Sequence, residues 1–263
     1  MLLPGGLFEG GTRSRHWSFK PVSGRLELAL CEAAETGSNT PRAVTQVLRL
    51  ALAHLGERPV TEARVANLCV GDRQFLMREL EQHLGRSGGW FHADCTTCAN
   101  RFDFSLQYAD LPVQEAGPSY PLVRVQWQDR QICFRLPTGA DQEQILEQPQ
   151  PEATSWLLHQ LLEEPECVLP CDNGFQSVVD AALEEVAPGI VTRVLTSCPE
   201  CEAENTVELD PYRLLAWKSD GLLKEIHQLA SHYHWSEAEI LALPRFRRQR
   251  YLDLIDQSRG MIQ

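Results

Sequence analysis

The sequence has no long apolar run and no net positive charge, and each absence argues against a class of protein. No stretch approaches the ~20 apolar residues that a membrane-spanning helix needs. The first six residues, Met-Leu-Leu-Pro-Gly-Gly, are too short for a secretory signal and lack its charged start. We therefore expect a cytoplasmic protein with no membrane partner.

The charge balance argues against a general nucleic-acid binder. The formal net charge is −12, whereas nucleic-acid affinity depends largely on neutralising phosphates with basic side chains. The charge is uneven, because residues 212–263 carry eight Lys and Arg against six Asp and Glu, which leaves −14 for residues 1–211. A mildly basic tail thus follows a strongly acidic body.

Patterns typical of enzymes are also missing. No Ser-His-Asp order, pair of catalytic carboxylates or glycine-rich nucleotide loop stands out. The segment Phe134-Arg-Leu-Pro-Thr-Gly139 lacks the Gly-x-x-x-x-Gly-Lys-Ser/Thr arrangement of a phosphate-binding loop, so it indicates a strand end followed by a helix cap. We expect no catalytic activity and no small-molecule substrate.

Cysteine is present in quantity, and four of the nine cysteines stand in two C-x-x-C motifs. These are Cys95-Thr-Thr-Cys98 and Cys198-Pro-Glu-Cys201, each followed by a strand-like run at residues 101–107 and 205–210. Two such motifs supply four thiolates, the closed tetrahedral set that structural Zn²⁺ prefers. In a chain without a leader, nine cysteines point to reduced thiols and metal. We predict one structural Zn²⁺ bound by Cys95, Cys98, Cys198 and Cys201.

The two motifs are separated by 99 residues, from Cys98 to Cys198, where a compact zinc ribbon has about twenty. Loop-closure cost grows by only about 0.6 kcal/mol per doubling, so this insert adds less than about 2 kcal/mol. Structural zinc contributes on the order of 10–16 kcal/mol. The site is therefore feasible if the insert folds and brings its two ends together.

Other readings of the cysteines remain open. Disulfides within each motif would need an oxidising compartment. A thioredoxin-like redox site would need its C-x-x-C between a strand and a helix, whereas strand-like runs follow both motifs here. A catalytic zinc would need an open coordination position, which four cysteines do not leave. His92 is an alternative ligand for the first motif. Cys167 and Cys171 could form half of a second metal site with His159 or Cys133, although packing is the commoner role of such cysteines.

The apolar periodicity predicts an α+β protein with an N-terminal helical unit, a split zinc ribbon carrying a hairpin-plus-helix insert, and a small C-terminal helical module. The predicted domains are residues 1–89, 90–211 and 212–263. Residues 1–16 are expected to be a flexible or docking arm. The other predicted elements are helices within 40–85, a hairpin of 121–127 with 131–136, short helices near 141–146, 154–164 and 176–186, and three helices after 220. The expected helix N-caps are Thr40 followed by Pro41, Asp72, Asp141, and Ser236 in a capping box with Glu239.

Several stretches together resemble a known family. They are the segment 17–30, the helix opening Val-Gly-Asp-Arg-Gln-Phe-Leu at 70–76, the two C-x-x-C motifs, and Phe-Arg-Leu-Pro-Thr-Gly-Ala-Asp at 134–141. They resemble zinc-ribbon proteins of contractile phage tails and related injection systems, similar to the T-even phage baseplate hub and hub-assembly family. Residues 227–236 and 243–248 separately resemble small helical proteins encoded beside the tape-measure gene.

This resemblance implies a non-catalytic assembly factor, chaperone or component of a baseplate, which could become part of a phage-tail-like particle. Its partners would be other tail proteins, from the hub or the tape-measure region, and the metal ligands would be the four cysteines named above. We expect the tail to contact partners through Tyr233, Trp235, Phe246, Arg247 and Arg248, because aromatic and Arg side chains dominate interface energies. The alternative is a zinc-ribbon regulator that binds nucleic acid through its basic tail.

Overall fold

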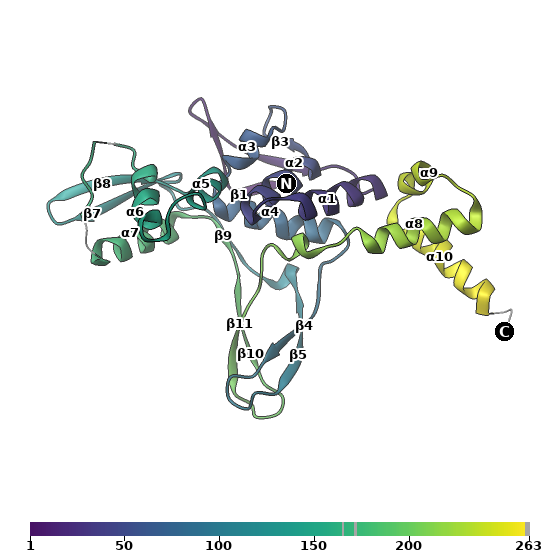
Figure 1. The fold of residues 1–263 in the computed structure, drawn as a ribbon. Helices are drawn as coiled ribbons and strands as arrows, with labels where there is room; N and C mark the ends of the chain where they lie inside the picture. Colours follow the sequence, from purple (N-terminus) through teal and green to yellow (C-terminus); the bar gives the residue numbers. More distant parts are fainter. Residues whose placement is uncertain (165, 171–172, 261–263) are drawn as a thin grey trace.

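Three smaller units extend in different directions from a central body (Figure 1). The computed structural model describes residues 1–164, 166–170 and 173–260, and helices and strands are mixed along the chain. Each of the four parts has its own cluster of buried apolar residues. The predicted mixture of helices and strands is therefore confirmed.

The central body packs four helices against a three-stranded antiparallel sheet of order β1-β2-β3. Its strands are β1 (Leu2–Glu9), β2 (Thr12–Phe19) and β3 (Leu52–Leu55), and its helices are α1 (Gly24–Thr36), α2 (Thr40–Ala51), α3 (Glu62–Ala66) and α4 (Val70–His83). Helix α2 begins as expected for Pro41 at the first turn, but its capping side chain is Asn39, which accepts from the Arg42 amide.

The prediction that residues 1–16 form a flexible or docking arm is wrong, because this segment belongs to the β1–β2 hairpin of the central body. Leu3 and Leu7 are buried in the core. The side chains of Arg13 and Arg15 donate to backbone carbonyls of β1 at 2.7 and 2.6 Å. Gly5 and Gly6 serve close packing, whereas Gly10 and Gly11 have the positive φ that the turn of the hairpin requires.

Asp72 holds this hairpin against α4. We predicted that Asp72 caps the helix, but Cys69 occupies the N-cap position and Asp72 lies inside the first turn. The buried carboxylate accepts from the amides of Gly5 (2.7 Å) and Gly6 (2.6 Å). Burial raises the pKa of Asp72, although both amides oppose the shift. A Cβ at Gly5 would lie 2.5 Å from this carboxylate, which explains the glycine.

The insert contains a hairpin of β7 (Leu122–Trp127) and β8 (Arg130–Arg135), as predicted. Its helices are α5 (Gly139–Ile145), α6 (Gln150–Leu161) and α7 (Asn173–Val186). After the short helix η1 (Tyr108–Asp110), β6 (Val113–Gln114) pairs with β9 (Gly189–Ile190). That pairing brings the two ends of the insert together. A metal site whose ligands lie on both sides of the insert requires this proximity.

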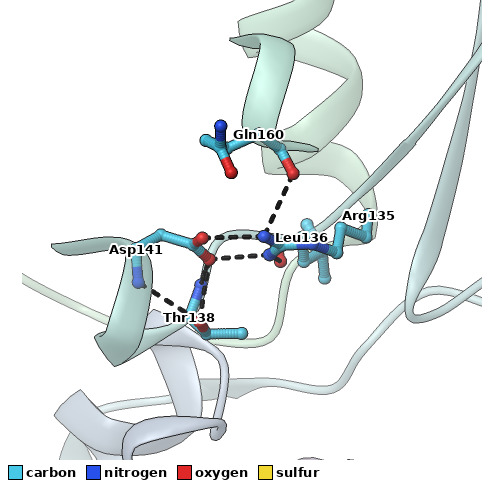
Figure 2. Close-up of polar contacts among 5 residues, drawn as sticks. All are labelled: Arg135, Leu136, Thr138, Asp141 and Gln160. Atoms are coloured by element: carbon cyan, nitrogen blue, oxygen red, sulfur yellow. Dashed lines mark hydrogen bonds and ion pairs between the residues drawn. The ribbon is translucent and has the colours of Figure 1, made fainter. Parts of the chain in front are cut away.

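Arg135 ties three elements of the insert together (Figure 2). Its guanidinium donates to both carboxylate oxygens of Asp141 at 2.6 and 2.7 Å, and to the Gln160 carbonyl near the end of α6 at 3.1 Å. The residue that caps α5 is Thr138, in a capping box with Asp141, so the predicted cap is displaced by three residues.

The C-terminal module consists of α8 (Asp220–Tyr233), α9 (Glu237–Ala242) and α10 (Arg245–Gly260). The predicted capping box of Ser236 and Glu239 opens α9. The preceding helix η2 (Arg213–Ala216) buries Leu214 in the core of the central body. Within the described residues, no helix is both long and apolar enough to cross a membrane.

Candidate metal centre

Two β-hairpins project together from the central body, and their turns carry the C-x-x-C motifs (Figure 1). The first hairpin pairs β4 (Gly88–Asp94) with β5 (Arg101–Gln107), and the second pairs β10 (Arg193–Ser197) with β11 (Glu204–Glu208). The hairpins form separate two-stranded sheets. The turns meet at the end of the projection farthest from the body.

The four predicted ligands come together at these turns. The sulfur atoms of Cys95, Cys98, Cys198 and Cys201 all lie within 4.8 Å of one another. The Sγ atoms of Cys95 and Cys201 are 3.6 Å apart, and those of Cys98 and Cys198 are 3.7 Å apart. These separations are too long for a disulfide of about 2.05 Å. They match the spacing of about 3.8 Å that tetrahedral metal–sulfur bonds of about 2.3 Å require.

The two turns have the same backbone geometry. The Cys95 amide donates to the Asn100 carbonyl at 2.9 Å, and the Cys198 amide donates to the Ala203 carbonyl at 3.0 Å. In each turn the residue after the second cysteine has a left-handed conformation, with φ of 59° at both Ala99 and Glu202. This turn conformation places both sulfurs of a motif on the same side of the turn. The two cysteines of each motif can therefore bind one ion together.

The electrostatics of the cluster favour a bound cation. Backbone amides of Cys98 and Thr97 donate to Cys95 and lower its pKa to about 6. The Ala203 amide acts on Cys201 in the same sense, but desolvation and the neighbouring thiols outweigh it and raise the pKa of Cys201 to about 12. Without a cation, therefore, one thiolate suppresses ionisation of its neighbours. A metal ion would favour the ionised form of all four.

The projection has little else to hold its tips together. Cys198 is 0% exposed and Cys95 4% exposed, and among the described residues their buried cluster adds Phe102, with Ala93, Phe104 and Ala203 packed against it partly buried. Cys201 is exposed at the rim. A cluster this small provides little apolar burial, so the link between the two turns depends on the cysteines and on a few polar contacts.

Asn205 is a residue of this site that motif spacing did not identify. Its side chain is 3% exposed, and its oxygen accepts from the amide and hydroxyl of Thr96 in the other turn at 2.9 and 3.1 Å. Its nitrogen donates to the Ala203 carbonyl at 2.8 Å and lies 3.6 Å from the Cys95 sulfur. The sequence offers one signal for this role. Asn205 stands four residues after Cys201, and the equivalent position in the first motif is the buried Phe102.

The other candidate ligands lie outside this cluster. His92 is exposed on β4 and does not join the four cysteines. Cys167 is partly buried against the insert core, and Arg130 donates to its sulfur at 3.3 Å. Cys171, the other cysteine of the alternative second site, lies outside the described residues.

The residues predicted to bind partners divide into two groups. Phe246 (74% exposed) and Arg247 lie on the surface of α10. Tyr233 and Trp235 stack at 4.8 Å, each half-buried, and both contact Tyr251 inside the module. Arg248 is not a surface contact, because its side chain is 0% exposed and donates to Glu27 of α1 at 2.8 Å.

Comparisons of the chain with protein-family models, with curated proteins and with solved structures return no match. The chemistry assigned to the cluster therefore depends on its four sulfurs, their spacing and their surroundings.

Proposed function

We propose that the four cysteines bind one structural Zn²⁺ and that the two hairpins are the halves of a split zinc ribbon. The observation that carries this proposal is the all-sulfur set with pairs at 3.6 and 3.7 Å. Four thiolates suit a tetrahedral structural zinc and leave no open position for a catalytic water. The metal would supply structural stability, and Asn205 would orient Cys95 and join the two turns.

We further propose that the protein is a non-catalytic assembly factor or component of a contractile phage tail or injection-system baseplate, formed in the cytoplasm. The resemblance described above supports this role, and so does the exposure of large apolar side chains on two projecting units. Trp90 and Leu195 on the hairpins are 75% and 73% exposed, and Phe246 on α10 is 74% exposed. Exposed aromatic side chains on projections are suited to contacts with hub or tape-measure proteins.

The nucleic-acid alternative is favoured by one feature of α10. Arg245, Arg247 and Arg250 are exposed beside Phe246, and basic side chains next to an aromatic ring suit a nucleic-acid strand. The net charge of −12 opposes this alternative.

The two roles can be separated by expressing the chain with its surrounding gene cluster. We expect tail proteins to co-purify with the native protein and to be lost with Trp90→Ala or Phe246→Ala. Leu146→Ala is the matched control, because Leu146 is also exposed (57%) but lies on the insert. Deletion of the gene should give particles that lack a complete baseplate. Normal particles with altered transcription, together with retention of the protein on DNA, would support the regulator instead.

A further inference from the structure

A small cavity lies where the two hairpins join the central body. Its lining comes from α4, from the root of the first hairpin, from β9 and from the segment after β11. It leaves about 20 Å³ of space for the centre of a water-sized sphere. One water needs about 10–15 Å³ by this measure, so the space accommodates a group of only a few atoms.

Arg78 of α4 lines this cavity with hydrogen-bond donors that have no acceptor, although the charge of the neighbouring Glu79 acts on it through space. The residue is 5% exposed, and its Nε and Nη1 atoms are buried without a hydrogen-bond partner. A buried donor without an acceptor is costly, and a buried charge without a partner is costlier still. The unpaired guanidinium therefore indicates that the site is completed by an acceptor from outside the chain.

The carboxylates near Arg78 are occupied elsewhere. Glu81 accepts from the Tyr108 hydroxyl at 2.9 Å and pairs with Arg213 at 3.2 Å. Glu79 accepts from Gln82 at 2.8 Å, and Asp210 from the amide of Tyr212 at 2.8 Å.

The remaining surface of the cavity is largely apolar. Its other charged lining residues are Arg213, Glu81 and Asp210, and the charge of Arg213 is paired with that of Glu81. The apolar lining residues are Phe91, Leu111, Ile190, Val191, Leu209 and Pro211. Low polarity beside the Arg78 donors, which have no partner, strengthens a hydrogen bond to an anion placed there.

We propose that this cavity binds a small monovalent anion, a halide or a carboxylate, which accepts a hydrogen bond from the Arg78 guanidinium. The volume excludes nucleotides and other large phosphate esters. Because the lining unites α4 with both hairpins and β9, a bound anion would stiffen the base of the projection. This inference is independent of the proposed baseplate role.

The test compares anions at constant ionic strength with the full-length protein. Gluconate is the reference anion, because it is too large for the cavity. Replacing gluconate with chloride or formate should raise the midpoint of thermal unfolding, and this effect should saturate with anion concentration. Arg78→Met should weaken the apparent affinity by roughly tenfold or more, since hydrogen bonds to charged groups are strong. Arg49→Met is the matched control, because Arg49 is exposed on α2 and outside the cavity.

A structure of crystals grown in bromide supplies a second readout that does not depend on how well the variant folds. Bromide density beside the Arg78 guanidinium would support the site, and formate stabilisation without a halide effect would restrict it to carboxylates. An ordered water there, with no bromide and with no stabilisation by formate, would overturn the proposal. Equal stabilisation by gluconate, or an unchanged response of a folded Arg78→Met variant, would also overturn it.

Discussion

Single buried residues join separate elements of this chain. Asn205 connects the two cysteine turns, Asp141 connects a strand to a helix, and Arg248 connects the C-terminal module to α1. Each is buried, and each satisfies several polar groups at once. Substitution of such a residue leaves its partners without hydrogen bonds, which is the costly outcome for buried polar groups.

Asn205 should determine how tightly the cysteine site holds its metal. Asn205→Leu keeps the approximate side-chain size but removes the hydrogen bonds to Thr96 and Ala203. Loss of groups that orient metal ligands typically lowers metal affinity about 10–100-fold. Competition with a chelator measures this change, and Asn100→Leu is the control because its side chain is exposed in the first turn. Equal affinities for the two variants would show that Asn205 does not orient the site.

Asp141 should make stability depend on pH in the acid range. Burial favours its neutral form, but hydrogen bonds from Arg135 and Thr138 outweigh burial and hold the pKa of Asp141 below its ordinary value. A lowered pKa in the folded state stabilises the protein above the unfolded pKa of about 3.9, and that stabilisation is lost as the pH falls through the folded value.

Asp141→Asn should therefore lower the free energy of unfolding by about 2 kcal/mol at neutral pH, and the penalty should shrink below about pH 4. Denaturant unfolding at several pH values measures both effects. Asp129→Asn, in the exposed turn of the β7–β8 hairpin, should leave stability nearly unchanged. A pH-independent penalty for Asp141→Asn would contradict the electrostatic explanation.

At the scale of elements, local sequence signals predicted those helices and strands whose stabilising contacts are local. The β7–β8 hairpin, the strand β5 and the capping box of α9 lie where the patterns placed them. Strand β3 was missed because its pairing partner is β2, and α2 runs directly into it without a breaking residue. The hairpin at residues 1–16 was missed because its anchors, Asp72 and Tyr120, lie more than sixty residues away.

The same distinction applies to the site. The cysteines were predictable because the spacing within each C-x-x-C motif is fixed by the turn that points two sulfurs at one ion. The role of Asn205 depends on Thr96, 109 residues away, and the burial of Arg248 depends on Glu27, 221 residues away. Neither contact can be predicted from a local sequence pattern.

The docking of α8–α10 onto the central body should depend on Arg248. Its side chain bonds Glu27 at 2.8 Å, the Leu243 carbonyl at 2.9 Å and Glu225 at 3.5 Å. Arg248→Met leaves Glu27 buried without its partner, which should cost about 3 kcal/mol or more. Hydrogen exchange of α8–α10 measures the loosening directly. Arg247→Met removes the same charge from the neighbouring exposed position, and an equal effect of both variants would contradict this account.

At the scale of the whole molecule, the chain is a body with projections instead of a single core. The insert and the C-terminal module each bury an apolar cluster, whereas the cysteine-bearing hairpins bury little besides the cysteines themselves. Such an arrangement presents separate surfaces, which fits the proposed assembly role, and it leaves one projection without an adequate apolar core. The proposed zinc supplies the missing stability there.

Elemental analysis of the purified native protein tests this central claim most directly. We predict about one zinc per chain, because four thiolates fill one tetrahedral shell. Cys198→Ser should abolish zinc binding, whereas Cys133→Ser, a partly buried cysteine outside the cluster, should retain it. A folded native protein without zinc, or a Cys198→Ser variant that keeps its full zinc content, would contradict the account.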